Sequence, residues 1–407
     1  MRIALVFLHP FSESMGSVVR VKELALGLGS LGAEVYIISP YERSFDLSDN
    51  VHVFSSNSFL ALSGLSTPIY HLSKFFYYNK LFPSVFSNIE TQFKKVKLLN
   101  KILKNITNFL VKKQIDIIQV EQDFAIPLGI NLKKETNLPL IADVHNISSE
   151  ELVSAGILER HSAAYFSLQN KIRSSLGQSD HVIVVSDCMK EYVINNYDID
   201  STNISVIPPG GRILTDRFSM KKRNKPYRVV YAGLVAYREH VDLFIKSIPH
   251  IPKRYSDVQY HVTNKGEAIH HIKNLANKLG IKPTFFWYDK YELVNCFLSS
   301  CHIGVLPSSD DIARRMGTPA KLFNYMSVGL PIVASKIGDW ANIIEDEKIG
   351  LLVQTNDPVD FAKAITCLLD NESLREDMSN NAFNAILQKY NWKKSAEKLM
   401  NIYDNFC

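Results

Sequence analysis

The sequence predicts an α/β protein of two domains, each built on a parallel sheet with helices packed against it. The chain has 407 residues, which is more than one hydrophobic core usually supports. Its 46% hydrophobic and 21% charged residues are typical of a folded globular protein and exclude a disordered or fibrous one. In both halves, short β-branched runs alternate with helical patterns, as in a parallel sheet covered by helices.

The first domain is expected over residues 1–207. Its strands are predicted at 3–8, 35–39, 115–120, 138–143 and 181–185, with a last strand starting at 204. Apolar residues recur at helical spacing over 18–31, and Gly32 stands where that helix would end. A polar and basic stretch then predicts a linker over 208–226.

The alternation restarts after the linker and predicts a second Rossmann-like domain over 227–390. Its strands are expected at 228–232, 258–263, 284–287, 303–306, 331–335 and 350–353. An amphipathic helix is predicted within 391–407. Neither half shows a repeat of fixed period, which disfavours a solenoid.

The cysteines and the apolar runs indicate a cytoplasmic protein. The five cysteines are scattered and lack the paired spacing of a zinc or redox site, so we expect reduced thiols. The first apolar run is too short for a signal peptide and is expected to be a buried strand. No uninterrupted apolar stretch of about 18 residues predicts a membrane-spanning helix.

The positive charge is concentrated in one segment. The formal net charge is +5, yet nine lysines lie between Lys74 and Lys113 against the single acid Glu90, with aromatic residues interleaved. Such a segment suits an anionic membrane surface, at roughly 1 kcal/mol per basic residue near it. We therefore expect a peripheral protein on the inner face of the cell membrane. The alternative is a solvated basic helix, and a nucleic-acid partner is not expected because no binding module accompanies the charge.

The segment after the strand at 303–306 contains the motif with the clearest chemistry. Thr318 is expected to cap a helix, Pro319 to take its first position and Gly329 to end it. Together with Gly317, this helix start would offer backbone N–H groups and a positive dipole end to a diphosphate.

Two side chains of this helix are expected to reach the ligand. Lys321 falls in the first turn, where it would bond phosphate. Asn324 lies three residues further along on the same face, where it would bond a ribose or sugar hydroxyl. Leu322 and Met326 are four apart and can pack inward. The alternative is a capped surface helix with a solvated lysine.

Residues 303–353 resemble the donor-binding signature of GT-B glycosyltransferases of the large group 1 type, which includes glycogen synthase and mannosyltransferase-like enzymes. The matching runs are 305–308, 321–335 and 350–353, and weaker matches extend over most of the chain. The resemblance implies two Rossmann-like domains facing across a cleft, with a terminal helix that crosses back to the first domain. It also implies a nucleotide diphosphate sugar as donor, bound by Gly233, Arg238, Gly317, Thr318, Pro319, Lys321, Leu322 and Asn324.

The chain departs from this family in two places. The family's two glutamates would fall at Met316 and Asn324, and its basic pair at Leu234 and Glu239. Lys321 and Arg238, the nearest cation, are therefore expected to meet the diphosphate charge. The run from Lys321 to Tyr325 is similar to a variant in the xanthan glucuronosyltransferase group.

That similarity implies that an acidic sugar would suit the donor site. Arg314 or Arg315 would then meet the carboxylate of the sugar. The alternative is a solvated arginine pair.

The acid or base chemistry is expected from the first domain. Glu121 and Asp123 follow one predicted strand, and Asp143 and His145 end the next, so all four lie at strand carboxyl ends. The run 143–146 resembles the family's Asp-x-His-Asn segment, which implies that His145 lies near the transferring sugar. Asp143 would orient His145 or act as the base itself, and both alternatives stay open.

The remaining expectations concern the acceptor and the reaction. Gly16 and Ser17 resemble the family's acceptor-side loop, and the Gly-x-Gly-x-x-Gly fingerprint of a dinucleotide-binding oxidoreductase is missing there. We expect sugar transfer to a hydroxyl of a lipid-linked or glycan acceptor, without a metal or cofactor. The alternatives are a nucleotide-sugar 2-epimerase of the same architecture and a non-catalytic sugar-nucleotide-binding protein.

Overall fold

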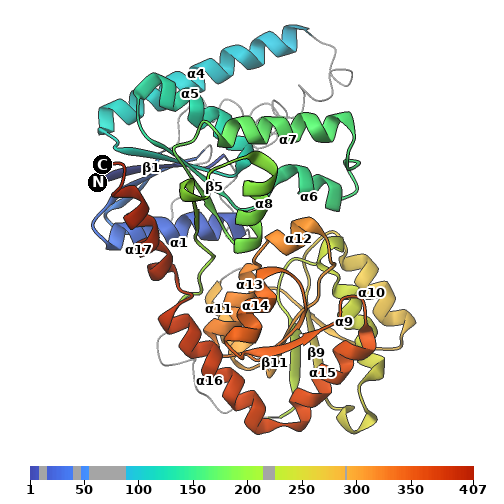
Figure 1. Cartoon of the computed structure of the whole chain (residues 1–407). Helices are drawn as coiled ribbons and strands as arrows, with labels where there is room; N and C mark the ends of the chain where they lie inside the picture. Colours follow the sequence, from blue (N-terminus) through green and yellow to red (C-terminus); the bar gives the residue numbers. More distant parts are fainter. Residues whose placement is uncertain (9–15, 40–46, 55–88, 214–224, 289–290) are drawn as a thin grey trace. The chain divides into compact units, whose positions relative to one another are not determined.

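The computed structural model describes residues 1–8, 16–39, 47–54, 89–213, 225–288 and 291–407. The chain divides into two compact units (Figure 1). The first contains Met1–Pro208 and Lys393–Cys407, and the second contains Pro209–Trp392. Each unit has one parallel sheet with helices against it, so the predicted α/β fold class is confirmed.

The first unit is built on a sheet of seven parallel strands, whose order reverses direction between β1 and β4. Four central strands are almost wholly buried and apolar, as strands covered on both faces require. The strands in spatial order are β3 (Val51–Phe54), β2 (Glu34–Ile38), β1 (Arg2–Val6), β4 (Ile117–Glu121), β5 (Leu140–Val144), β6 (His181–Val184) and β7 (Ile204–Val206).

The helices of the first unit begin and end where local signals place them. Gly32 follows α1 with φ +92°, the left-handed conformation that ends a helix, and confirms the predicted stop. Ser186 caps α8 by accepting a hydrogen bond from the N–H of Met189 at 3.0 Å. The helices are α1 (Gly16–Ser30), α4 (Ile89–Lys113), η2 (Asp123–Ala125), α5 (Ile126–Thr136), α6 (Ser148–Ser154), α7 (Ala163–Leu176), α8 (Asp187–Tyr197), η3 (Ser201–Asn203) and α17 (Trp392–Tyr403).

The end of the chain belongs to the first unit. From α17, the hydroxyl of Ser395 donates to the carbonyl of Pro208 at 3.2 Å. The hydroxyl of Tyr403 donates to Oε1 of Gln119 on β4 at 2.5 Å. A segment that follows the second unit in the sequence therefore completes the core of the first.

The second unit is built on six parallel strands, and all six predicted strands are present with bounds within one residue of the prediction. Their order reverses between β8 and β11. In spatial order they are β10 (Thr284–Phe286), β9 (Gln259–Thr263), β8 (Arg228–Tyr231), β11 (Ile303–Leu306), β12 (Ile332–Ser335) and β13 (Gly350–Val353).

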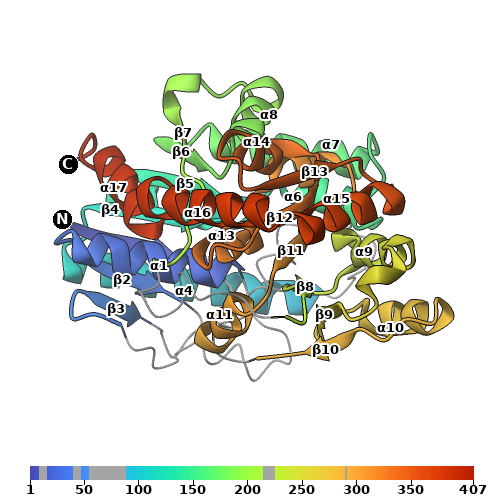
Figure 2. The same ribbon diagram turned by 90° about the horizontal axis from the view of Figure 1, so that it is seen from below.

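Successive strand residues of this sheet enter different cores, because side chains alternate between the faces of a strand. Val229 and Tyr231 join the core that α9, α10 and α15 cover, whereas Val230 joins the core that α11, α13, α14 and α16 cover. Figure 2 shows these two groups of helices on opposite sides of the sheet. The helices are η4 (Tyr237–Glu239), α9 (Val241–Ser247), η5 (Ile248–His250), η6 (Lys253–Tyr255), α10 (Ile269–Lys278), α11 (Tyr291–Ser299), α12 (Ile312–Met316), α13 (Ala320–Ser327), α14 (Gly338–Asp346), α15 (Pro358–Asp370) and α16 (Glu372–Gln388).

The short strand β3 was not predicted. Part of the linker predicted over 208–226 lies outside the described residues, as does the part of the basic segment before α4. Among the helices of the described residues, none combines the length and the apolarity that crossing a bilayer requires.

Gly304 allows α13 to pack closely on β11, and this contact gives a stability prediction. A Cβ at Gly304 would lie 2.7 Å from Cδ2 of the buried Tyr325 ring. Gly304→Ala is therefore expected to destabilise the second unit by about 1–3 kcal/mol through overpacking, measured by denaturant unfolding. Gly177→Ala is the control, because its Cβ would approach other atoms only to 3.4 Å. Equal effects of the two substitutions would contradict the prediction.

Candidate functional site

The candidate donor site lies at the carboxyl ends of β8 and β11, where the strand order of the second unit reverses. Open parallel sheets bind ligands at such a reversal, because the two neighbouring loops lead away to opposite faces. The loop after β8 leads to η4 and carries Gly233, Arg238 and Glu239. The loop after β11 leads to α12 and α13, which carry Arg314 and Lys321.

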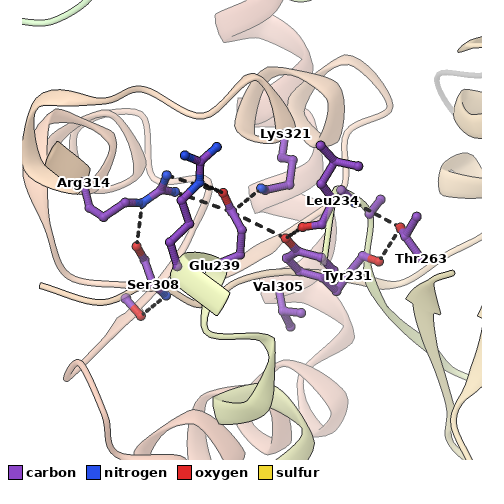
Figure 3. A network of polar contacts seen from close by, with 12 residues as sticks. Tyr231, Leu234, Glu239, Thr263, Val305, Ser308, Arg314 and Lys321 are labelled. Carbon is purple, nitrogen blue, oxygen red and sulfur yellow. Dashed lines mark hydrogen bonds and ion pairs between the residues drawn. The ribbon is translucent and has the colours of Figure 1, made fainter. Parts of the chain in front are cut away.

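Three basic side chains meet there around one carboxylate (Figure 3). Nζ of Lys321 lies 2.5 Å from Oε2 of Glu239, and Nη1 of Arg314 lies 3.4 Å from Oε1. Nε of Arg238 lies 3.9 Å from Oε1. The side chains of Lys321, Arg314 and Glu239 are 15%, 14% and 9% exposed, whereas that of Arg238 is 48% exposed. We call these four residues the Glu239 cluster.

Helix α13 and Gly233 position Lys321. Lys321 is the second residue of α13, and Nζ lies 5.3 Å from the centroid of the Tyr231 ring. A Cβ at Gly233 would lie 2.4 Å from Cδ of Lys321, so a larger residue there would displace the lysine stem. The N–H of Gly233 donates to Oγ1 of Thr263 at 3.0 Å, which fixes this backbone beside the lysine.

Helix α12 positions Arg314. Its backbone N–H donates to Oδ1 of the capping residue Asp311 at 3.0 Å, and its Nε donates to Oγ of Ser308 at 3.2 Å. These bonds hold the guanidinium group toward Glu239. Arg315 instead pairs with Asp310, at 2.6 Å from Nε to Oδ1, with its side chain 60% exposed. Of the arginine pair considered for a sugar carboxylate, only Arg314 enters the cluster.

The carboxylate and the basic groups of the cluster shift one another's pKa values. Burial acts to raise the pKa of Glu239, but Lys321 and Arg314 outweigh it and lower that pKa to about 2. Burial lowers the pKa of Lys321, and the attraction of Glu239 opposes this change. Glu239 is therefore ionised at any physiological pH, and the cluster holds three cations against one anion.

One detail of the predicted donor motif, the start of α13, is wrong. Thr318 does not cap α13: Pro319 is the N-cap residue, no side chain supplies a capping bond, and the helix begins at Ala320. The reason is that α12 ends at Met316, so extended residues have to connect the two helices. Leu322 packs inward as predicted, because its side chain is fully buried in the core. Its part in donor binding stays a prediction.

The other predicted donor residues lie near the cluster in the sequence and in the fold. Asn324 is half-buried one turn after Lys321 on α13. Gly317 has φ −80° and ψ 148° and connects the two helices. Glu239 was missed as a site residue, since its position was interpreted only as the loss of a family cation. The signal was a carboxylate directly beside Arg238 in a loop at a strand end.

The first unit has a second buried charge cluster. Glu121 ends β4, and Asp143 lies opposite it on β5 in the register of the sheet. Nε2 of His145 lies 2.9 Å from Oε2 of Glu121 and 3.3 Å from Oδ1 of Asp143. The side chain of His145 is 11% exposed, and both carboxylates are fully buried. The structure thus brings together three of the four residues predicted for catalysis.

Arg20 and Gln119, which were not predicted, complete this cluster. Arg20 of α1 donates to both oxygens of Asp143 at 3.1 Å and to the carbonyl of Ile207 at 3.0 Å. Gln119 donates to Oε1 of Glu121 at 2.7 Å. The signal for Arg20 was its helical position four residues before the buried Leu24, on the apolar face of α1.

The cluster holds His145 as a cation. Burial acts to lower the pKa of His145, but Asp143 and Glu121 outweigh it and raise that pKa to about 8. Burial and the charge of Asp143 raise the pKa of Glu121. Burial also acts to raise the pKa of Asp143, yet Arg20 and His145 lower it. At neutral pH a protonated His145 can donate a hydrogen bond but cannot act as a general base.

The donor set of this cluster also fits a metal ion. Ligand atoms of Glu121, Asp143 and His145 all lie within 4.8 Å of one another. However, Arg20 already bonds both oxygens of Asp143, and its positive charge would repel a cation. The expectation of a metal-free reaction stays a prediction.

The last predicted site residues have different surroundings. Both oxygens of Asp123 accept hydrogen bonds from Ser148, from its N–H at 2.7 Å and its hydroxyl at 2.6 Å. Asp123 therefore anchors the start of α6. Gly16 and Ser17 open α1, and the residues directly before them lie outside the described part of the chain.

Two sequence families together account for most of the chain. The family described as Glycosyltransferase Family 4 matches residues 15–210, and Glycosyl transferases group 1 matches residues 213–385. Both describe glycosyltransferases. The chain belongs to the group 1 glycosyltransferases, which confirms the resemblance found in residues 303–353.

Individual proteins are also similar to this chain, in sequence or in fold. An uncharacterized glycosyltransferase of Methanocaldococcus jannaschii is 23% identical over 290 residues, which cover 68% of this chain and 72% of that protein. Sucrose-phosphate synthase from Thermosynechococcus elongatus has a similar fold, with a TM-score of 0.76, 16% identity, and coverage of 99% of this chain and 98% of that one. HepE of Anabaena in complex with UDP-glucose has a TM-score of 0.67 and 14% identity, and both chains are fully covered.

The raised pKa of His145 gives a prediction that NMR can test. His145 should titrate near pH 8, whereas His181, whose pKa burial lowers, should titrate below 6.5 and serves as internal control. Because the folded-state pKa is the higher one, the protonated group contributes up to about 2 kcal/mol of stability below pH 6.5, which is lost as pH rises through 8. In Glu121→Gln the pKa of His145 should fall. An unchanged pKa in that variant would contradict the proposed contact.

Proposed function

We propose that this glycosyltransferase moves a sugar from a nucleotide diphosphate sugar to a hydroxyl of an acceptor, with the donor's diphosphate bound at the Glu239 cluster. The observation that carries the proposal is the excess of positive charge at the strand reversal of the second unit. Lys321, Arg314 and Arg238 surround a single carboxylate there, and the start of α13 lies beside them.

The proposed binding mode follows from charge. The first turn of α13 presents backbone N–H groups and a positive dipole end, which favour phosphate oxygens. Lys321 offers an ammonium group from the same turn, and the planar guanidinium group of Arg314 can bond two phosphate oxygens at once. As the sugar leaves, negative charge grows on the nucleoside diphosphate, and fixed cations stabilise that charge. These groups would supply the charge that a divalent metal otherwise provides.

Known structures support the choice of donor. The fold is shared with HepE, whose structure contains UDP-glucose. Membership of the group 1 family supports sugar transfer itself, whereas nothing supports the alternative of a nucleotide-sugar 2-epimerase. The similarity to the xanthan glucuronosyltransferase group stays a prediction, and Arg314 is the cation that would meet an acidic sugar.

We assign the acceptor side of the reaction to the first unit. His145 would hold a sugar hydroxyl as a protonated donor, fixed by Glu121 and Asp143. Asp143 is bound by Arg20 through both oxygens, so it orients His145 rather than serving as the base. Glu121, whose pKa is raised, is the carboxylate best suited to exchange a proton.

The donor proposal is tested by nucleotide-induced thermal stabilisation. A ligand that binds only the folded state raises the unfolding temperature by mass action. Nucleoside diphosphates and nucleotide sugars should stabilise the wild type, and Lys321→Ala should lose most of this effect because it loses a direct phosphate contact. Lys389→Ala is the matched control, since Lys389 is an exposed partner of Glu347. Stabilisation that survives in Lys321→Ala would refute the proposed site.

Turnover then separates an enzyme from a binding protein. Release of nucleoside diphosphate that depends on an acceptor supports transfer. Stabilisation by a donor without turnover over a broad acceptor panel would favour the non-catalytic alternative.

We further propose a lipid-linked or glycan acceptor at the anionic inner face of the cell membrane. In the described part of α4, Ile102, Ile106 and Leu110 are buried at helical spacing, whereas Lys101 and Lys104 are exposed. These lysines continue the basic segment of the sequence. They support a surface that anionic headgroups attract.

Membrane binding is tested with phosphatidylserine-containing vesicles. Lys101→Gln with Lys104→Gln should weaken co-sedimentation by about 2 kcal/mol, or about 30-fold, at low salt. The control pair is Lys363→Gln with Lys398→Gln, at exposed positions of α15 and α17. Equal binding to neutral vesicles, or equal losses in both pairs, would contradict a specific role of α4.

A further inference from the structure

Glu239 stands out because it is an anion within a site that the proposed function gives to an anionic ligand. Its carboxylate lies within 4.0 Å of Lys321, Arg314 and Arg238, the groups that would bond phosphate. The hydroxyl of Tyr231 also lies within reach of its Oε2, at 3.4 Å. A carboxylate in this position weakens anion binding by simple Coulomb repulsion, so its presence needs a reason.

The fold holds Glu239 firmly in this position. Its backbone N–H donates to the carbonyl of Ala236 at 3.0 Å, and η4 then ends at His240, which has the left-handed φ of 48°. The side chain is 9% exposed. It cannot turn into solvent without breaking contacts with both Lys321 and Arg314.

One role of Glu239 is to hold the basic side chains around it in place. Three cations placed together in a largely buried site repel one another, and burial favours loss of the proton from a lysine. A buried carboxylate partner keeps the lysine charged and fixes the direction of both long side chains. Glu239 therefore prepares Lys321 and Arg314 for phosphate before a ligand arrives.

A second role concerns the amount of charge. The three cations exceed the carboxylate by two charges. The diphosphate of a nucleotide sugar is esterified at both ends and carries two negative charges. The nucleoside diphosphate left after transfer has a free terminal phosphate and carries about one more, with a second pKa near 6 as for other phosphate monoesters.

We propose that Glu239 is a specificity-determining and positioning residue, an internal counter-anion that matches the donor site to the two charges of a nucleotide sugar and disfavours retention of the released nucleoside diphosphate. This proposal rests on the proposed function. It assigns to Glu239 the balance between donor binding and product release. The residue acts through Lys321 and Arg314.

The test compares Glu239→Gln with the wild type by calorimetric titration of UDP, GDP, ADP and their glucose conjugates. For the nucleotide that the wild type binds, the diphosphate should bind about tenfold more tightly to the variant, equivalent to about 1.4 kcal/mol. The nucleotide sugar should gain by a smaller factor. In steady-state kinetics, the inhibition constant of the product nucleoside diphosphate should fall by a larger factor than the KM for the donor.

Two further variants test whether the net charge of the cluster sets the ratio of the affinities for nucleoside diphosphate and nucleotide sugar. Glu239→Asp retains the anion and should retain the wild-type ratio of the two affinities. Arg314→Gln lowers the excess charge to one and should shift that ratio in the opposite direction, even if Glu239→Gln does not fold. Asp310→Asn is the matched control, because it removes a carboxylate that pairs with the exposed Arg315, and it should change neither affinity.

The outcomes separate this proposal from the proposed function. If the wild type binds neither nucleoside diphosphates nor nucleotide sugars, the proposed function fails. If it binds both, but Glu239→Gln and Arg314→Gln change the two affinities by equal factors, the role of Glu239 in charge matching is overturned. A loss of kcat in Glu239→Gln with unchanged binding would also overturn it.

Discussion

In both units, ionised side chains are buried at the carboxyl ends of the strands, at the point where the strand order of the sheet reverses. Each of them has a side chain of opposite charge in contact. Removing an isolated ion from water costs several kcal/mol, so such a side chain is stable only with a well-placed partner. Arg20 with Asp143 and Lys321 with Glu239 are the two central pairs. The loops that carry them are therefore fixed by electrostatics as well as by packing.

The two clusters differ in their balance of charge. In the first unit, two basic side chains, Arg20 and His145, face two acidic ones, Glu121 and Asp143, so the network has no excess of basic groups. In the second unit, cations outnumber the single carboxylate, which leaves a site suited to an anion. A reaction between a charged nucleotide sugar and a hydroxyl acceptor needs both kinds of site. The family match shows a glycosyltransferase, and the proposed reaction would use both kinds of site.

The sequence predicted the elements whose signals are local. Strands of the second sheet were found within one residue because most of them lie in short apolar runs, whereas the apolar run of β3 is interrupted by the exposed His52. Lys321 was found because helix signals surround it. The partners were missed because pairing is not local: Arg20 and Asp143 are 123 residues apart, and Glu239 and Lys321 are 82 apart. A sequence shows each charge but not which opposite charge it meets.

The hydrogen bond from Tyr403 to Gln119 extends this argument to the order of the chain. Gln119 uses its carbonyl oxygen to accept from Tyr403, and its amide group is thereby turned to donate to Glu121 at 2.7 Å. Glu121 in turn holds His145. Because α17 follows the whole second unit in the sequence, the cluster around His145 is complete only when the last helix has packed. The amide orientation that fixes Glu121 therefore depends on the end of the chain, although Glu121 and His145 lie in its first half.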